Sequence, residues 1–434
     1  MRLIDPNLNT LPCVSIFVFT KHVFTGQKTH FLSIFFPSPL PVQTVVYCLG
    51  SKFFRKGASA AVHFTRIQLK QFRNYSFLDL PLHPGITVLH GPNGSGKTNL
   101  LEAMHLLSLG RSHRTQQDRE MTAAGCDHSV VLGETMRLDG KHEIQVSLHP
   151  HEKPHKKVLL YNKPAQRIGD LMGHATVVMF SPEDIRIVRD GPAARRRFVD
   201  MQLSQIRPGY LRTLKTYINI LESRNALLKQ NKLFGVQDFG TQLDTWDEQL
   251  ALASAPLVRA RRWFLAQLSL NASEQYAAIS ENPGEPFALR YAGPLADAAD
   301  PVQAMLDGLQ RSRREDMQRM YTTFGPHRDD VAMLLCERDL RAFGSQGQLR
   351  TAVLSMKLGE IRLIEEEMGE PPTLLLDDVL SELDLKRRNA LLKSTAGIQT
   401  LLSCTDRADA AGAKADVFLR VSTLDDRSAQ ICEE

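Results

Sequence analysis

The sequence feature that most constrains this chain is the stretch Gly91-Pro-Asn-Gly-Ser-Gly-Lys-Thr98. It follows an apolar run at residues 86–90 and precedes a helical apolar periodicity at residues 99–109. A strand, a glycine-rich turn and a helix N-terminus direct several backbone N–H groups at one point, where a polyphosphate can bind. An ordinary glycine-rich turn would need neither the lysine nor the threonine. The context therefore predicts a P-loop that binds a nucleoside triphosphate.

Two residues of this loop carry most of the chemistry. Lys97 supplies a full positive charge for the β- and γ-phosphates and is a predicted catalytic residue, and the Thr98 hydroxyl is a predicted ligand for Mg²⁺. The expected cofactors are ATP and Mg²⁺. The residues of the loop predicted to bind the nucleotide are Gly91, Pro92, Asn93, Gly94, Ser95, Gly96, Lys97 and Thr98.

An acidic element lies about 280 residues further along the chain. The apolar run 373–376 ends in Asp377 and Asp378, as a Walker B strand does. Asp377 can hold Mg²⁺ through its water shell, and Asp378 can orient or deprotonate the attacking water. The pattern is common at the end of a buried strand. It gains weight here because it follows a P-loop and precedes the turn Ser381-Glu-Leu-Asp384.

A second anion site is predicted at Ser345-Gln-Gly-Gln348, which opens a helical periodicity. The Ser345 hydroxyl, the backbone at Gly347 and the side chain of Gln348 would meet the positive end of the helix dipole. One chain needs only one phosphate cradle, so the spare one suggests contact with a nucleotide held by a second copy. The alternative is that Ser345 is an ordinary N-cap of the following helix.

Residues 1–61 differ from the rest of the chain. They contain six Lys or Arg and one acid, Asp5, which leaves residues 62–434 with no net charge. Prolines interrupt the uncharged run 31–50, and the order of a signal peptide is missing, so no membrane association is expected. We predict that this extension is upstream sequence read from a misplaced start, or is disordered, and that translation begins near Val62.

The remaining chain divides by its periodicity into three parts. We expect the N-terminal half of an ATPase lobe at 62–182, a helical lobe at 183–300 and the C-terminal half of the ATPase lobe at 301–434. The six cysteines are scattered and form no Cys-x-x-Cys pair, which fits a reducing cytoplasm. Because residues 62–434 carry no net charge, any nucleic-acid binding must come from a local basic patch.

These motifs, in this order, resemble the α/β ABC-type ATPase head of SMC and Rad50-like proteins, and most closely the bacterial RecF family. The resemblance spans residues 62 to about 425, with an inserted helical lobe and without a long coiled coil. It implies that Arg73 and Asn74 also bind the nucleotide. The matching stretches are Phe72–Tyr75, Gly91–Thr98, Gly110–Arg114, Gly325–Asp330, Ser345–Arg350 and Asp377–Asp384.

The resemblance implies an ATP-dependent DNA-binding protein of recombinational gap repair, replication and the SOS response. Such a protein forms an ATP-dependent homodimer on single- and double-stranded DNA, hydrolyses ATP slowly, and acts with RecO and RecR to load RecA. It would be cytoplasmic and nucleoid-associated. Two alternatives share the motif order: the ATPase subunit of an ABC transporter, and a chromosome-organising ATPase of SMC type. The arginines that we consider for phosphate contacts are Arg111, Arg114, Arg195, Arg196, Arg197, Arg259, Arg261 and Arg262.

Two positions depart from a general ABC head. Asp378 stands where a Glu is usual, and its side chain is one methylene shorter, which suggests slow hydrolysis. Thr405-Asp406 follows the last predicted strand, where a His usually senses the γ-phosphate. The sequence therefore does not identify which residue senses the γ-phosphate in this chain.

Overall fold

The computed structural model describes residues 63–433 except 116, 281, 283 and 425–427, together with the backbone of three strands nearer the N-terminus. These three, β1 (Ser15–His22), β2 (Lys28–Phe35) and β3 (Val46–Tyr47), form an antiparallel sheet within a compact unit, Met1–Ser59. Val62 lies outside the described residues, and the translation start near it stays a prediction. Residues 60–434 form the second compact unit.

The nucleotide-site strands lie in a mostly parallel sheet with the order β11-β15-β16-β6-β17-β18. Strand β16 therefore separates the strand that leads into the P-loop, β6, from the strand that ends in Asp377, β15. The bounds are β6 (Ile86–His90), β11 (Val177–Phe180), β15 (Thr373–Asp377), β16 (Thr400–Cys404), β17 (Val417–Thr423) and the antiparallel edge strand β18 (Ala429–Glu433).

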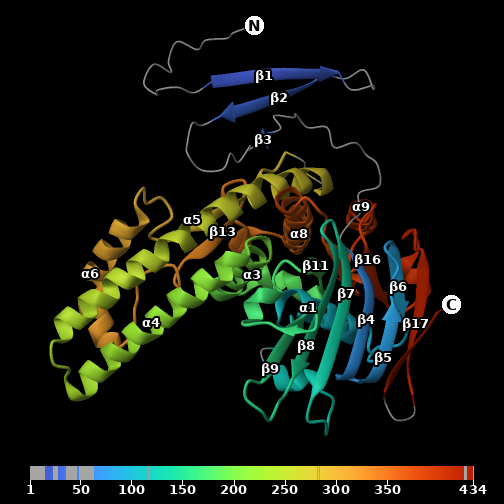
Figure 1. The fold of residues 1–434 in the computed structure, drawn as a ribbon, viewed down its shortest axis with the longest axis horizontal. Helices are drawn as coiled ribbons and strands as arrows, with labels where there is room; N and C mark the ends of the chain where they lie inside the picture. The colour runs from blue at the N-terminus through green and yellow to red at the C-terminus, as the bar shows by residue number, and fades with distance from the viewer. Residues whose placement is uncertain are drawn as a thin grey trace. The chain divides into compact units, whose positions relative to one another are not determined.

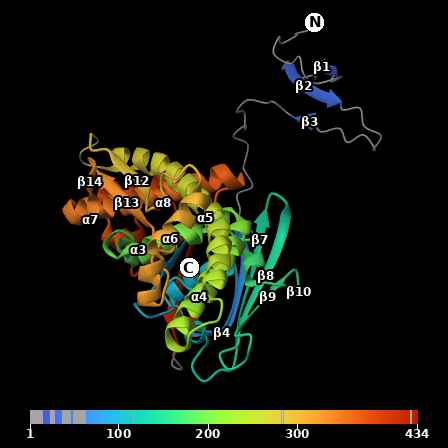
Figure 2. The same cartoon turned by 90° about the vertical axis from the view of Figure 1, so that its left-hand side faces the viewer.

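A second sheet is antiparallel, with the order β10-β9-β8-β7-β4-β5 (Figures 1 and 2). Helix α1 (Lys97–Leu109) packs against both sheets, and 11 of its 13 residues are buried, because apolar side chains surround almost its whole circumference. The strands are β4 (His63–Phe72), β5 (Tyr75–Pro81), β7 (Ser129–Arg137), β8 (Gly140–Leu148), β9 (Lys156–Leu160) and β10 (Lys163–Pro164).

The helical lobe, formed by α2 to α6, extends away from the two sheets (Figure 1). Its longest helix, α5, has 41 residues and is about 60 Å long at 1.5 Å per residue. Helix α6 begins at Pro301, the first residue after the predicted boundary, and packs against α4 and α5. The helices are α2 (Arg186–Arg189), α3 (Pro192–Ile206), α4 (Pro208–Phe234), α5 (Phe239–Ile279) and α6 (Pro301–Arg319).

A buried arginine holds this lobe together. Arg224 of α4 is fully buried, and it donates to Asp247 of α5 at 2.6 Å and to Asp316 of α6 at 2.8 Å. Breaking one side of such an ion pair costs about 3–5 kcal/mol, because it leaves an uncompensated charge in the interior. The three helices are thus joined by charge as well as by apolar packing.

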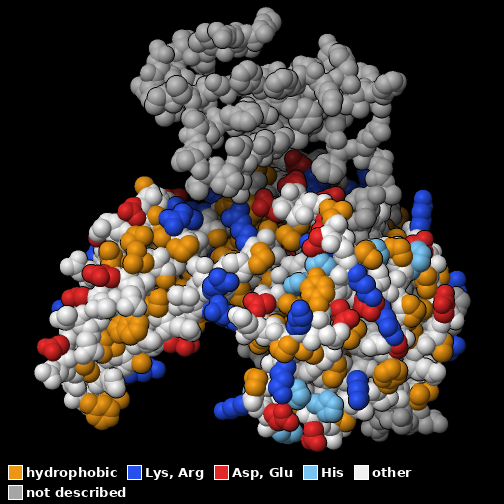
Figure 3. All heavy atoms as spheres, in the orientation of Figure 1, with side chains coloured by type: hydrophobic (Ala, Val, Ile, Leu, Met, Phe, Trp, Pro, Cys, Tyr) orange, Lys and Arg blue, Asp and Glu red, His pale blue; other side chains and the backbone are white. Residues whose placement is uncertain are grey.

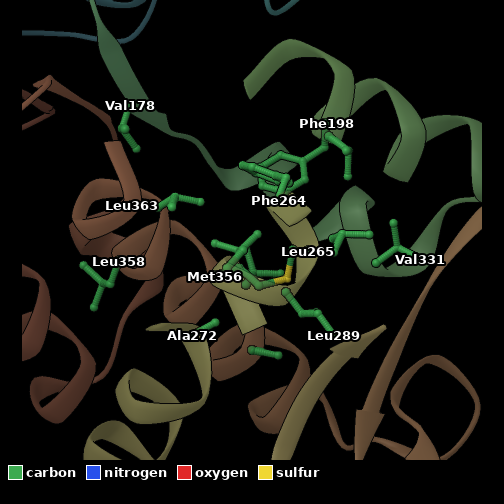
Figure 4. Close-up of a cluster of buried hydrophobic side chains, with 14 of the residues drawn as sticks. Val178, Phe198, Phe264, Leu265, Ala272, Leu289, Val331, Met356, Leu358 and Leu363 are labelled. Atoms are coloured by element: carbon green, nitrogen blue, oxygen red, sulfur yellow. The ribbon is translucent and has the colours of Figure 1, made fainter. Parts of the chain in front are cut away.

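Helix α8 (Gln346–Met368) attaches the predicted second anion site to this framework. It packs closely on α5: a Cβ at Gly359 would lie 2.8 Å from the backbone nitrogen of Ala272. Figure 4 shows the core around this contact, where Phe264, Met356 and Leu289 meet. The other elements are β12 (Phe287–Ala292), β13 (Asp330–Leu335), β14 (Arg338–Asp339), α7 (Leu340–Phe343) and α9 (Leu385–Ser394).

The described residues also form five short 3-10 helices. They are η1 (Asp118–Met121), η2 (Ile168–Leu171), η3 (Pro182–Ile185), η4 (Leu380–Glu382) and η5 (Arg407–Ala410). Within the described residues, none of the helices has both the length and the apolar character that crossing a membrane requires.

Candidate nucleotide-binding site

The P-loop turn depends on glycines with left-handed backbone. Gly91 has φ +149°, and a Cβ there would lie 2.1 Å from the carbonyl oxygen of Val421, so no larger residue fits. Gly96 has φ +118° and ends the loop directly before α1. The loop as the sequence predicts it, a turn between a strand and a helix, is what the structure contains.

The loop closes around the Lys97 ammonium group. Its Nζ donates to the carbonyl oxygens of Gly91 at 2.6 Å and Pro92 at 2.9 Å, and the residue is only 7% exposed. Burial lowers the pKa of Lys97, and the nearby carboxylates of Asp378 and Asp377 oppose that shift. The ammonium group is therefore fixed at the centre of the loop.

Asp377 and Thr98 meet although they are 279 positions apart. The Thr98 hydroxyl donates to Asp377 Oδ1 at 2.8 Å, and Ser403 Oγ donates to the same oxygen at 2.8 Å. The sheet order explains the contact, because β16 places Ser403 between the ends of β6 and β15. Ser403 is not among the predicted site residues, although its position at the end of an apolar strand is a signal for it.

Asp378 has an unusual backbone conformation at the mouth of the site. Its φ is +50°, a value that Asp adopts more readily than most residues, and its N–H donates to Ser403 Oγ at 3.0 Å. Burial raises the pKa of Asp378, and the adjacent Asp377 raises it further, while Lys97 opposes this. A carboxyl group with a raised pKa is suited to accept a proton.

The residues present fit a triphosphate with a divalent cation. Ser95 Oγ is buried and has no hydrogen-bond partner among the described residues, so the loop contains an unsatisfied hydroxyl. Thr98 and Asp377 offer a hydroxyl and a carboxylate, and Mg²⁺ typically takes one or two such protein ligands and completes its shell with phosphate and water.

The segment Phe72–Tyr75 braces the loop from one side. Asn74 Nδ2 donates to the carbonyl oxygen of Ser95 at 3.1 Å, and the Tyr75 hydroxyl donates to that of Gly96 at 3.1 Å. Arg73 forms a two-pronged ion pair with the buried Glu102 of α1, at 2.7 and 2.8 Å. These contacts position the P-loop; direct nucleotide binding by Arg73 and Asn74 stays a prediction.

Thr405 borders the loop on the side of the parallel sheet. Its carbonyl oxygen accepts from the N–H of Gly91 at 3.2 Å, and its hydroxyl donates to Asn93 Oδ1 at 3.3 Å. Asp406 instead caps η5 by accepting from the N–H of Ala408. Of the two residues at the open switch position, Thr405 is the one in contact with the P-loop.

Within this chain Ser345 is an N-cap, the alternative that the sequence left open. Its hydroxyl accepts from the N–H of Gln348 at 3.2 Å, and its own N–H donates to Gln348 Oε1 at 2.9 Å. The Gly347 carbonyl oxygen accepts from Arg387 at 3.1 Å. Ser345 is exposed, so it remains accessible at the start of α8.

Two of the arginines considered for DNA contacts are structural. Arg195 is 6% exposed and pairs with Asp330 at 2.6 Å, and Arg261 is 3% exposed and pairs with Asp200 at 2.9 Å. Their assignment to DNA phosphates is wrong, because each guanidinium is buried against a carboxylate. Arg262 is engaged as well, since it donates to the carbonyl oxygens of Leu295 and Ala298.

The mostly parallel sheet, the P-loop and the strand β15, whose terminal Asp377 reaches Thr98 of the loop, define an ATPase head of the ABC and SMC type. The model of the RecF/RecN/SMC N-terminal domain matches residues 63–428. The chain is 40% identical over 354 residues to the DNA replication and repair protein RecF of Symbiobacterium thermophilum, covering 80% of this chain and 92% of that one. The RecF protein of Alkaliphilus oremlandii is 39% identical over 346 residues, covering 78% and 92%. The chain belongs to the RecF family.

Solved structures agree with this assignment. The structure of the recombination mediator protein RecF with ATP, in the RecFOR pathway, superposes with a TM-score of 0.80 at 31% identity, covering 87% of this chain and all of that one. The Smc head domain of Pyrococcus furiosus gives a TM-score of 0.51 at 16% identity over 86% of this chain and 96% of that one, which is a likeness of fold alone.

Proposed function

We propose that this chain is an ATP-dependent DNA-binding protein of recombinational gap repair, DNA replication and the SOS response. The observation that carries the proposal is the hydrogen bond between Thr98 and Asp377, which joins the P-loop to the acidic strand in a member of the RecF family. Lys97 and the loop N–H groups bind the β- and γ-phosphates of ATP.

Thr98 and Asp377 are the residues that would hold Mg²⁺, which, when bound, neutralises charge on the phosphates. Asp378 accepts a proton from the attacking water or orients it. Asp is one methylene shorter than the Glu usual at this position, and its backbone is fixed by the bond to Ser403. We therefore expect slow hydrolysis that resets the protein rather than sustained turnover.

Ser345, Gly347 and Gln348 act on the nucleotide of a second copy. Their support is the exposed position of Ser345 at the positive end of a 23-residue helix. Two chains would then enclose two ATP molecules, and ATP would be the link between them. This homodimer binds single- and double-stranded DNA and, with RecO and RecR, assists the loading of RecA in the bacterial cytoplasm and nucleoid.

Analytical sedimentation of the full chain tests this proposal. We expect a monomer without nucleotide, a dimer with ATP and Mg²⁺, and a larger complex when duplex DNA is added to the dimer. A chain that sediments as a monomer under all three conditions would contradict the dimer. A dimer that ignores DNA would contradict the DNA-binding role while leaving the nucleotide switch intact.

A further inference from the structure

The motif Gly110–Arg114 follows the P-loop helix, and three of its side chains contact residues of that helix. Ser112 Oγ donates to Glu102 of α1, and Arg114 donates to Asn99 Oδ1 at 3.0 Å. The His113 ring lies edge-on to His105 of α1, with 5.3 Å between the ring centroids. These contacts serve α1 and leave Arg111 as the side chain of the motif with another role.

Arg111 lies at a recess of about 440 Å³ between the end of α1, the antiparallel sheet and the helical lobe. The recess has an apolar floor that includes the buried Leu109, Met172 and Leu211. Its charged lining consists of Arg111, Lys156, Arg197, Lys215 and Asp118. On the face shown in Figure 3, Lys and Arg side chains gather where the helical lobe meets the antiparallel sheet.

Part of the positive charge of this recess has no ion-pair partner among the described residues. Lys156 is used internally, since its Nζ donates to the Gly110 carbonyl oxygen at 2.7 Å and to Asp118 at 2.8 Å. For the side chains of Arg111, Arg197 and Lys215, no ion pair or hydrogen bond is formed with any described residue. Burial lowers the pKa of Arg111 and the neighbouring Arg197 lowers it further, while the carboxylates of Asp200 and Asp118 oppose this shift.

Two guanidinium groups that repel each other beside an apolar floor are stable neighbours only when an anion lies between them or water screens them. A low-dielectric wall strengthens their attraction for an anion. Guanidinium and ammonium groups together match the geometry and charge of a phosphate. The buried Arg195, by contrast, has its carboxylate within the chain, whereas Arg111 and Lys215 are exposed and Arg197 is half-buried.

We propose that this recess is a phosphate-binding site, formed by Arg111, Arg197 and Lys215, that holds a backbone phosphate of DNA. The inference rests on the proposed DNA-binding function and gives it a location. Because α1 begins at Lys97 of the P-loop and ends at Leu109, two residues before Arg111, one buried helix joins the two proposed phosphate sites. The same chemistry would accept free phosphate, so the experiment separates the two sources.

The test compares Arg111→Gln and Lys215→Ala with Lys229→Ala, which changes an exposed lysine of the same helix α4 outside the recess. Duplex DNA binding is measured with ATP at several salt concentrations. Each lost phosphate contact is expected to lower affinity about 5-fold at ~0.15 M salt and to reduce the slope of log K against log salt by about 0.9. Lys229→Ala should change neither, and none of the variants should lose ATP binding.

A second arm measures thermal unfolding with added inorganic phosphate while a non-hydrolysable ATP analogue fills the P-loop. If DNA binding is unchanged in the recess variants but phosphate stabilises the wild type and not a protein that carries both Arg111→Gln and Lys215→Ala, the ligand is free phosphate. If neither DNA nor phosphate distinguishes the variants, or if Lys229→Ala loses as much as Lys215→Ala, the site is refuted. A wild type that binds no DNA would refute the proposed function, and the phosphate arm would still test the recess.

Discussion

The two halves of the proposed nucleotide site differ in how the chain completes them. The P-loop half has its partners inside the chain: Lys97 is enclosed by carbonyl oxygens, and Thr98 is joined to Asp377. The half at Ser345 is exposed at the start of α8, where its hydroxyl only caps the helix. In the function proposed above, the enclosed half binds the nucleotide on its own, whereas the exposed half contacts a second copy of the chain.

This difference predicts that ATP affinity and dimerisation can be changed independently. Changes in the enclosed half should alter nucleotide binding or hydrolysis in each chain. Changes at Ser345 or in the attachment of α8 should alter dimerisation alone. The four predictions below test this independence. A variant that changes ATP binding and dimerisation equally would contradict it.

The largest effect is expected for Asp378→Asn, which removes the proton acceptor. Hydrolysis should fall about 1000-fold, and the ATP-bound dimer should accumulate. In the wild type, the raised pKa of Asp378 should make hydrolysis decline on acidification at a higher pH than an ordinary Asp would cause, because the ionised form is needed. Phosphate release and sedimentation measure both properties.

Asp300→Asn is the matched control for this variant, because Asp300 is the N-cap of α6 and Asn caps a helix equally well. It should hydrolyse ATP at the wild-type rate. An Asp378→Asn protein that stays monomeric with ATP would show that Asp378 has another role.

Lys97→Met should weaken ATP binding about 100-fold, which corresponds to about 3 kcal/mol for charge-assisted hydrogen bonds lost in an enclosed site. Lys97→Arg should also weaken ATP binding, because a planar guanidinium cannot occupy the place of a compact ammonium. Calorimetric titration measures the affinity, with Lys229→Met as the control on an exposed lysine. Unchanged affinity in Lys97→Met would exclude a phosphate role for this residue.

Ser345→Asp should keep α8 intact, because Asp is as good an N-cap as Ser, while placing a negative charge where the partner's γ-phosphate is expected. We expect dimerisation with ATP to weaken at least about 10-fold, the effect of roughly 1.4 kcal/mol. Ser345→Arg, which is too large for the interface, should act in the same direction.

Sedimentation reports the dimer, and titration of ATP into the monomer is expected to be unchanged for both Ser345 variants. If ATP binding fell together with dimerisation, Ser345 would act on the nucleotide of its own chain.

The smallest effect is expected for Gly359→Ala, where the new methyl group would lie 2.8 Å from the backbone of Ala272. Separating α8 from α5 should lower the free energy of unfolding by about 1–3 kcal/mol. It should weaken dimerisation by moving Ser345 while leaving ATP affinity unchanged. Gly240→Ala in α5 is the control, since a Cβ there has no atom within 4 Å. Equal melting temperatures for both variants would show that α8 is not held by this contact.

The sequence alone was sufficient for the P-loop, the acid-tipped strand and the helix at Ser345. Each is a contiguous motif whose backbone geometry follows from local residue choice, such as the glycines at 91 and 96. It also predicted that Thr98 and Asp377 share a site, because both are predicted ligands of the same Mg²⁺ ion.

The roles of charged residues were decided only by the tertiary structure. Arg195 and Arg197 are two positions apart in one cluster, yet one pairs with Asp330 in the interior and the other lines a basic recess. A charge in the sequence has the same character whether it is solvated, buried with a carboxylate or available to a ligand. What distinguishes these cases is the position of the opposite charge, and for Arg195 that charge lies 135 residues away in the chain. Only the folded chain brings Asp330 next to Arg195. The sequence alone does not reveal this pairing, because the free energy of an ion depends on what surrounds it in space.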